Sequence, residues 1–173
     1  MTDASQPTSQ LSSQLLYQQT ASHTPGHSGG LAFDVKIRNH TISIDATAAH
    51  GGADRGPSPK DLLVSAVLGC TGMDVAALLK KAQLPIRKFY LNGGAVMKNT
   101  RHPKTFEHVE VQYHFELDGE ANDVALSHIH KAVNDSMTRF CGVSAMLSKA
   151  CPIHYEVFVN QTKTIEGQAA FTN

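Results

Sequence analysis

The stretch that most constrains the fold is residues 62–79, where Asp74 is the only formal charge. Ser58 can cap this stretch as a helix, and Pro59 suits the first helical position. The two lysines that follow residue 79 would lie at the negative end of the helix dipole. Because Pro85 cannot continue a helix, the sequence predicts one long helix that ends just before it.

A run of this length could also cross a membrane. However, Ser65 and Thr71 interrupt it, and a helix that is apolar on nearly every face is also typical of a protein core. We therefore expect a central core helix and no membrane contact. Gly69 and Gly72 flank the segment around Cys70 and each cost about 1 kcal/mol relative to alanine. Their bare backbone would let another element or a small ligand approach closely.

Alternating apolar residues predict strands elsewhere in the chain. The predicted strands cover residues 31–38, 41–45, 86–99, 106–117 and 151–159, with a weaker one over 14–22. Asn39-His40 is expected to turn the first two into a hairpin. Gly93-Gly94 is expected to form a bulge. The alternation over 106–117 slips by one residue near His108.

A second helix is predicted from Asn122 or Asp123 to Phe140, with one apolar stripe that includes Ser136. Gly142 is expected to end it in the left-handed conformation, and a short helix follows over 143–150. Because strands and helices come in blocks, the predicted fold class is α+β with a mainly antiparallel sheet.

The length of 173 residues suits one domain, which we place at residues 14–161. A disordered N-terminal tail is expected over 1–13 and a C-terminal tail over 162–173. The 15 basic and 15 acidic residues cancel, so neither nucleic acid nor an anionic membrane is an expected partner. Three cysteines and no export signal in residues 1–13 predict a reducing, cytoplasmic location.

Cys70 and Cys141 each lie on a predicted helix beside a glycine. A cysteine is nucleophilic as the thiolate, whose formation needs a nearby cation or a helix N-terminus. Cys141 precedes a short helix and could feel its N-terminus. The candidate cations for Cys70 are Arg38, Arg55, Arg101 and Arg139. The alternative is that both cysteines are simply small buried hydrophobic residues.

The 10 histidines raise the question of a metal site, but their spacing matches no known metal motif, and no metal is expected. Asp74 lies one turn after Cys70 on the same helix face. As a base it would raise the pKa of the thiol. Its expected role is instead a hydrogen bond to a neighbouring backbone group or hydroxyl.

Several segments together resemble the OsmC/Ohr family, the osmotically inducible protein C and organic hydroperoxide resistance proteins. These segments are Gly51-Gly52, Gly56-Pro57-Ser58-Pro59-Lys60-Asp61-Leu62-Leu63, Gly69-Cys70-Thr71-Gly72-Met73-Asp74-Val75, His102-Pro103-Lys104-Thr105-Phe106 and Cys141-Gly142-Val143-Ser144-Ala145-Met146-Leu147. The resemblance spans roughly residues 31–160, and its Cys70 segment is most similar to an OsmC-like subgroup.

The resemblance implies sheets wrapped around two long central helices in an intertwined homodimer, with active sites at the interface. It also implies thiol-dependent reduction of organic hydroperoxides, in which Cys70 attacks and Cys141 resolves. The resulting disulfide would be reduced by a dithiol such as a lipoylated protein. No cofactor is expected, because the cysteines carry the chemistry.

The sequence departs from the family at the position after the helix-opening proline. Members with established peroxidase activity carry a glutamate there, paired with an arginine, whereas this chain has Lys60 followed by Asp61. Asp61 therefore joins Arg38, Arg55 and Arg101 as a candidate binding or activating residue. The alternative function is a non-catalytic relative that binds an apolar or electrophilic small ligand at the dimer interface. Cys151 matches no family role, and we expect a core thiol.

Overall fold

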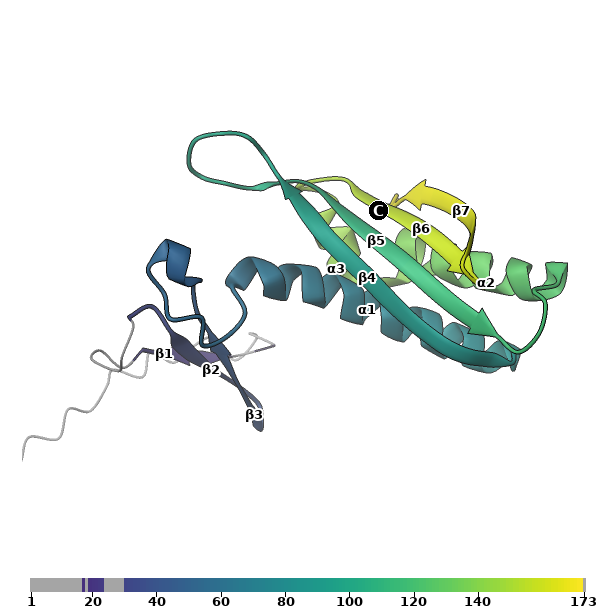
Figure 1. Ribbon diagram of the computed structural model, residues 1–173, viewed down its shortest axis with the longest axis horizontal. Coiled ribbons are helices and arrows are strands. Elements are labelled where there is room, and N and C mark those ends of the chain that lie inside the picture. The colour runs from purple at the N-terminus through teal and green to yellow at the C-terminus, as the bar shows by residue number, and fades with distance from the viewer. Residues whose placement is uncertain (1–16, 18, 24–29, 173) are drawn as a thin grey trace, which may run out of the picture. The chain divides into compact units, whose positions relative to one another are not determined.

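The computed structural model describes residues 17, 19–23 and 30–172. The chain divides into two compact units, with the boundary between Lys60 and Asp61. Figure 1 shows the helices and strands of both units. The sequence predicts a single domain over residues 14–161, whereas the described residues fall into one unit up to Lys60 and another from Asp61. The predicted disordered tail over 1–13 lies outside the described residues.

The N-terminal unit contains a small antiparallel sheet in the order β1-β2-β3. Its elements are β1 (Thr20–Ser22), β2 (Phe33–Ile37), β3 (His40–Ile44) and the 3-10 turn η1 (Ala48–His50). Ile37 pairs with His40, so the hairpin turn consists of Arg38 and Asn39. The prediction of an Asn39-His40 turn is therefore off by one residue. Arg38 adopts the left-handed conformation, with φ of 54°, that closes this turn.

Asp45 holds the glycine-rich loop of this unit in place. Its carboxylate accepts backbone N–H groups from Ala46 (2.8 Å), Ala53 (3.0 Å) and Arg55 (3.2 Å). Burial acts to raise the pKa of Asp45, but these hydrogen bonds outweigh it and hold the pKa below its ordinary value. Gly52 is required here, because a Cβ at this position would lie 1.9 Å from the carbonyl oxygen of Ala46.

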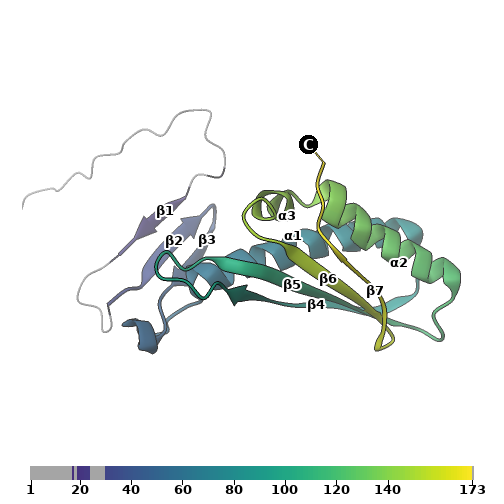
Figure 2. The same cartoon turned by 90° about the horizontal axis from the view of Figure 1, so that it is seen from above.

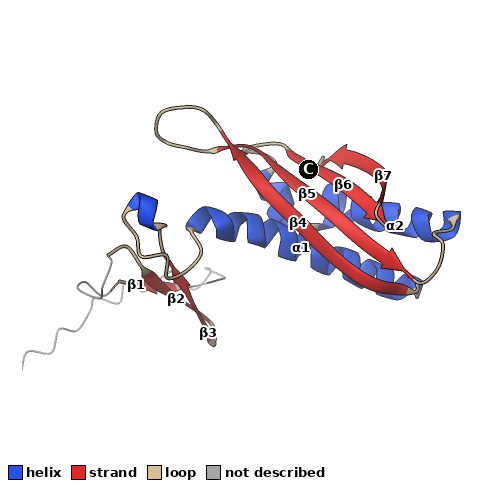
Figure 3. Cartoon of the chain, in the orientation of Figure 1, coloured by secondary structure: helices blue, strands red, loops and turns tan. Residues whose placement is uncertain are grey.

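The second unit packs helices on one face of a four-stranded sheet (Figures 2 and 3). Its elements are α1 (Pro59–Ala82), β4 (Ile86–Met97), β5 (Phe106–Leu117), α2 (Asp123–Asp135), the π-helical turn η2 (Ser136–Phe140), α3 (Gly142–Leu147), β6 (Ile153–Val159) and β7 (Thr162–Gln168). The strand order is β4-β5-β6-β7. The pairs are antiparallel except β5 with β6, which is parallel. The α+β class and the mainly antiparallel sheet are confirmed.

The C-terminal segment differs from the sequence prediction. Residues 162–168 form β7 and pair with β6, so the prediction of a tail from residue 162 is wrong. The reason is that β7 is an edge strand whose residues are mostly exposed or half-buried, and its polar sequence shows little alternation.

Two glycines of β4 and one bulge between β4 and β5 differ from the sequence prediction. Gly93 and Gly94 pair regularly with β5, so the predicted bulge does not lie there. The strand register shifts instead between Val96 and Met97, opposite which Glu107 is an extra residue in β5. This extra residue explains why the alternation of β5 slips near His108. Gly93 serves close packing, because a Cβ there would lie 2.7 Å from Leu68 of α1.

The end of the second helix also differs from the sequence prediction. The predicted left-handed Gly142 is instead the first residue of α3, and Cys141 ends the π-helical turn with φ of −69° and ψ of 97°. The N–H of Cys141 donates to the carbonyl of Ser136, five residues earlier. A π turn adds a residue to the helix, and Phe140, predicted as part of the apolar stripe, is 49% exposed.

The core of the second unit lies between the sheet and the two long helices. The alternating residues of β5, from Val109 to Leu117, are buried with the apolar stripe of α2, which includes Ile129 and continues to Met137 of η2. On α1 the buried residues are Val67, Thr71, Val75 and Leu79. They recur every fourth residue and so line one face of the helix.

Among the described residues of the second unit, the opposite face of α1 has no element packed on it. We call this the open face of α1; its exposed residues with apolar side chains are Leu63, Ala66, Met73, Ala76 and Ala77. Met73 is 70% exposed. Within the described residues, α1 is the helix long and apolar enough to span a membrane, and 22% of its most apolar window is buried. These features show a helix with more apolar surface than its own chain covers.

Candidate functional site

The structure brings Cys70 and Cys141 together, although they are far apart in the sequence. Their Sγ atoms and a carboxylate oxygen of Asp74 all lie within 4.8 Å of one another. α1 presents Cys70 and Asp74 one turn apart, whereas Cys141 comes from the junction of the π-helical turn with α3. All three residues belong to the second unit, so this unit alone builds the cluster.

Cys141 is completely buried and caps the N-terminus of α3. Its thiol donates to Ser144 Oγ at 3.0 Å, and its sulfur accepts the backbone N–H of Ser144 at 3.3 Å. Burial raises the pKa of the Cys141 thiol, and the neighbouring Cys70 raises it further. The two hydrogen bonds from and to Ser144 act in the opposite direction but do not offset this. Cys141 is therefore a protonated thiol at neutral pH, despite the contact with a helix N-terminus that the sequence predicts.

A buried chain of hydroxyl groups lies behind the two thiols. Thr71 Oγ1 shares hydrogen bonds with the Tyr113 hydroxyl and, at 2.8 Å, with Ser136 Oγ. Ser136 Oγ in turn donates to Asp74 Oδ2 at 3.0 Å. Burial raises the pKa of Tyr113, and the nearby Cys141 and Asp74 add to this, while the hydrogen bond with Thr71 lowers it. The chain joins α1, β5 and the end of α2, and it fixes the carboxylate of Asp74.

This network shows which group the carboxylate of Asp74 contacts. Its carboxylate accepts a hydroxyl hydrogen bond, as the sequence analysis expects. Sequence reasoning assigned no role to Tyr113 or Ser136. A signal was present for Ser136, because a serine within an otherwise apolar stripe needs a buried partner.

The candidate activating residues occupy different parts of the molecule. Arg38 forms the hairpin turn and Arg55 anchors its backbone on Asp45, both in the N-terminal unit. Asp61 lies in the first turn of α1, and Arg101 is exposed in the loop between β4 and β5. Of the predicted site residues, Cys70 and Cys141 are the ones the structure brings together.

Arg139 is engaged at the surface. Its guanidinium lies 3.9 Å from the carboxylate of Asp135 and over the ring of Phe140. Cys151 is buried within the hydrophobic core, which confirms the expected core thiol. Burial raises the pKa of Cys151, and the charge of Lys98 lowers it.

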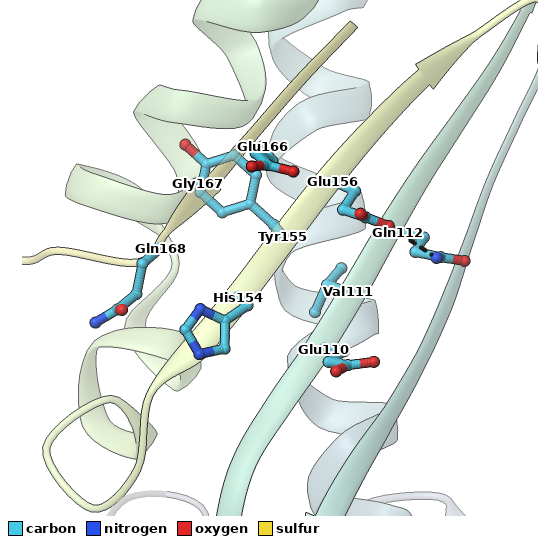
Figure 4. A pocket seen from close by; sticks show the side chains of 9 residues that line it. All are labelled: Glu110, Val111, Gln112, His154, Tyr155, Glu156, Glu166, Gly167 and Gln168. Atoms are coloured by element: carbon cyan, nitrogen blue, oxygen red, sulfur yellow. Dashed lines mark hydrogen bonds between the residues drawn. The ribbon is translucent and has the colours of Figure 1, made fainter. Parts of the chain in front are cut away.

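A separate groove of about 580 Å³ lies over β5, β6 and β7 (Figure 4). Its polar lining residues are Glu110, Gln112, His154, Glu156, Glu166 and Gln168. Gln112 donates to Glu156 at 3.0 Å, and Lys163 binds Glu156 at 3.3 Å and Glu166 at 2.8 Å. The groove is lined by no cysteine, and its carboxylates are largely paired, so the thiol chemistry belongs to the cluster around Cys70.

Comparison with known proteins identifies the family of this chain. Residues 51–156 match a family described as OsmC-like protein, a span that includes both Cys70 and Cys141. Since this is more than half of the chain, the protein belongs to the OsmC/Ohr family.

The relatives include uncharacterised proteins and organic hydroperoxide resistance proteins. The chain is 28% identical over 120 residues to protein YhfA of Escherichia coli K12, covering 68% of this chain and 83% of YhfA. A hypothetical protein from Aquifex aeolicus VF5 is similar in structure, with a TM-score of 0.68, 20% identity and coverage of 84% and 97% of the two chains. An organic hydroperoxide resistance protein OsmC from Legionella pneumophila is also similar in structure, with a TM-score of 0.55 and 14% sequence identity. The match covers 86% of this chain and 98% of that protein. At these identities the two structures show the fold.

Proposed function

We propose that this protein is a thiol-dependent peroxidase that reduces organic hydroperoxides to alcohols. The observation that carries the proposal is the approach of Cys70 and Cys141 to within 4.8 Å from distant parts of the chain. A short rearrangement of side chains would bring two such sulfur atoms to bonding distance. Family membership supports the reaction class, since some structural relatives are named organic hydroperoxide resistance proteins.

The burial of the two thiols supports separate roles. Cys70 is half-buried and open to a substrate, whereas Cys141 is enclosed and protonated. In the first step the Cys70 thiolate attacks the distal oxygen of the hydroperoxide and the O–O bond breaks. The hydroxyl group stays on the sulfur as a sulfenic acid, and the leaving alkoxide takes from solvent the proton that Cys70 released on ionisation, which gives the alcohol. In the second step the sulfur of Cys141 attacks that sulfenic acid, water leaves, and a disulfide forms. A dithiol, such as a lipoylated protein, then reduces the disulfide by exchange and is itself oxidised.

We also propose that the active form is a homodimer in the cytoplasm. The open face of α1 supports a second copy as the occupant, because this face borders Cys70 and is otherwise apolar surface in water. A second copy would also provide another N-terminal unit, so that Arg38 or Arg55 could supply the cation that stabilises the Cys70 thiolate. A lipid bilayer is the less suitable cover, since α1 packs Leu68 against Gly93 of a sheet.

Alanine variants of the three cysteines test the proposed roles. After one equivalent of cumene hydroperoxide, the parent should lose two free thiols and form a disulfide. Cys70→Ala should consume no hydroperoxide. Cys141→Ala should react once, stall as a sulfenic acid and proceed to sulfinic acid under excess peroxide. Cys151→Ala is the matched control and should behave like the parent.

Intact-mass spectra separate the possible results. Oxygen gained by Cys70→Ala but not by Cys141→Ala would reverse the two roles. No mass change in any variant or in the parent would reject the peroxidase. The chain would then be better explained as a ligand-binding relative in which Lys60 replaces the catalytic glutamate of the family.

A further inference from the structure

The two thiols and the carboxylate together form a ligand set that sequence spacing did not reveal. We infer that reduced Cys70, Asp74 and Cys141 form a binding site for a thiophilic divalent cation, of which Zn²⁺ is the reference. Their ligand atoms lie within 4.8 Å of one another. The sequence shows no metal motif, because Cys141 joins the other two ligands only through the packing of α2 and α3 beside α1.

The geometry suits a tetrahedral ion. With Zn–S of about 2.3 Å and Zn–O of about 2.0–2.2 Å, ligand atoms of a tetrahedral site are separated by about 3.3–3.8 Å. Cys70 and Asp74 are four residues apart on α1 and therefore project from the same side of the helix. Closing the remaining ångström requires side-chain rotation and no change of fold.

The charges of the site favour a cation once the thiols ionise. A divalent ion would neutralise most of the charge of two thiolates and one carboxylate. Binding would release the two thiol protons to solvent, so the affinity should rise with pH.

The surroundings already contain the support that a metal ligand needs. Ser136 Oγ donates to Asp74 Oδ2 at 3.0 Å, and Thr71 holds Ser136 from behind at 2.8 Å. Such hydrogen bonds to ligand carboxylates orient them and strengthen binding. Because Cys70 and Asp74 are only half-buried, one side of the cluster stays open for a water as the fourth ligand. Two sulfur ligands select Zn²⁺ over Mg²⁺ or Ca²⁺.

This inference does not rest on the proposed peroxidase activity, since it needs only the reduced cluster. If the metal site and the peroxidase activity both exist, a bound ion and the disulfide exclude each other. The reason is that the sulfur atoms of Cys70 and Cys141 either bind the ion or form the disulfide. A bound ion would then protect the thiols from hydroperoxide, and oxidation would release the ion.

The test uses the full chain, reduced and freed of metal, and no hydroperoxide. Titration with Co²⁺ as a spectroscopic substitute should give one ion per chain, with a thiolate-to-cobalt charge-transfer band that Zn²⁺ displaces. Competition with a chromophoric chelator then gives the Zn²⁺ affinity. Cys70→Ser and Cys141→Ser should each remove the charge-transfer band of a two-thiolate site and lower the affinity by more than the roughly 10–100-fold expected for loss of an outer-shell partner.

Two further variants and a matched control sharpen the result. Asp74→Asn should weaken binding, and Ser136→Ala should weaken it by about 10–100-fold while keeping the band. Cys151→Ser removes a buried thiol outside the cluster and should leave affinity unchanged. Far-UV circular dichroism confirms the fold of each variant; if Cys141→Ser fails to fold, the half-buried Cys70→Ser carries the test.

Three outcomes would overturn the inference. The first is that the reduced parent binds no stoichiometric ion. The second is that Cys70→Ser binds as tightly as the parent, which would move the ion to other ligands such as His108 and His154, whose rings lie 5.5 Å apart. The third is an equal loss of affinity in Cys151→Ser. A failure of metal binding would leave the hydroperoxide assays unchanged, so the two proposals are tested independently.

Discussion

The two long helices of the second unit bury their apolar residues in different ways. α2 has one apolar stripe, and the rest of the described chain buries its residues Ile129, Ala132 and Val133. α1 is apolar nearly all round, yet it buries one face and exposes the other, including Met73. The comparison shows that the apolar periodicity of α2 predicts which face its own chain covers, whereas α1, apolar nearly all round, leaves apolar surface that the proposed dimer would cover.

The proposed site lies where these two kinds of helix meet. Cys70 lies on α1 at the border between its buried and open faces, and Cys141 lies in the enclosed segment after α2. One thiol is thus accessible and one is protected, as a two-step thiol reaction requires.

The largest expected effect comes from charging the open face of α1. Met73→Glu should convert the proposed dimer to monomer, because an unpaired carboxylate cannot be buried without a large cost. The lost apolar contact alone is about 1.5–3 kcal/mol for each methionine, and a symmetric dimer has two. Light scattering at micromolar concentration measures the change.

The matched control is Val124→Glu on α2, since Val124 is 64% exposed and also apolar. It should keep the oligomeric state of the parent, because a carboxylate suits the first turn of a helix. A parent that is already a folded monomer of 18.6 kDa would contradict the proposed dimer.

The apolar stripe of α2 should determine the free energy of unfolding of a single chain, whereas the open face of α1 should determine dimer formation. In the Met73→Glu background, Ile129→Ala should lower the free energy of unfolding by about 2–5 kcal/mol, since Ile129 is fully buried. Ala substitution at Leu63, which is 45% exposed, should change it by no more than about 0.5 kcal/mol in the same background. Urea denaturation measures both. Equal effects would show that the single chain covers the two helices alike.

The hydroxyl chain that joins the two helices should contribute a smaller amount. Thr71→Val keeps the shape of a fully buried side chain but leaves Ser136 and Tyr113 short of a partner. The expected loss is about 1–3 kcal/mol in the free energy of unfolding. Thr138→Val is the control, because its hydroxyl bonds a helix carbonyl near the surface. The interpretation fails if both variants lose the same free energy.

The smallest expected effect is a dependence of stability on alkaline pH. Burial raises the pKa of Cys141 above the ordinary thiol value of 9.0. Unfolded thiols release protons near that value while the folded Cys141 keeps its own, so the unfolded state binds fewer protons and stability falls as pH rises above about 9. The melting temperature of Cys141→Ala should therefore fall less steeply with pH than that of the parent. The same slope in both would place the pH dependence on other groups.

Much of the fold follows from local sequence patterns. The bounds of α1 follow from its cap, its charges and Pro85, and the structure begins and ends it at Pro59 and Ala82. The alternation of β5 predicts its inward residues, including the slip that the structure explains as a bulge. These features are encoded within single turns or single strands, where the periodicity is direct.

The remaining features depend on contacts between distant segments. No local pattern predicts that Ser136 would reach Asp74 or that Gly93 would receive Leu68. β7 was missed because an edge strand needs little apolar surface. For the site, the roles of Cys70 and Cys141 as a reacting pair followed from the family resemblance, since spacing does not show which helices approach each other.

The most direct test of the central claim is peptide mapping of the full chain after one equivalent of cumene hydroperoxide, under conditions that prevent thiol exchange. The account predicts one disulfide-linked peptide pair that joins Cys70 to Cys141, with the loss of one hydrogen from each thiol and with Cys151 still free. A disulfide that involves Cys151, or Cys70 and Cys141 both unchanged after the hydroperoxide is added, would contradict it.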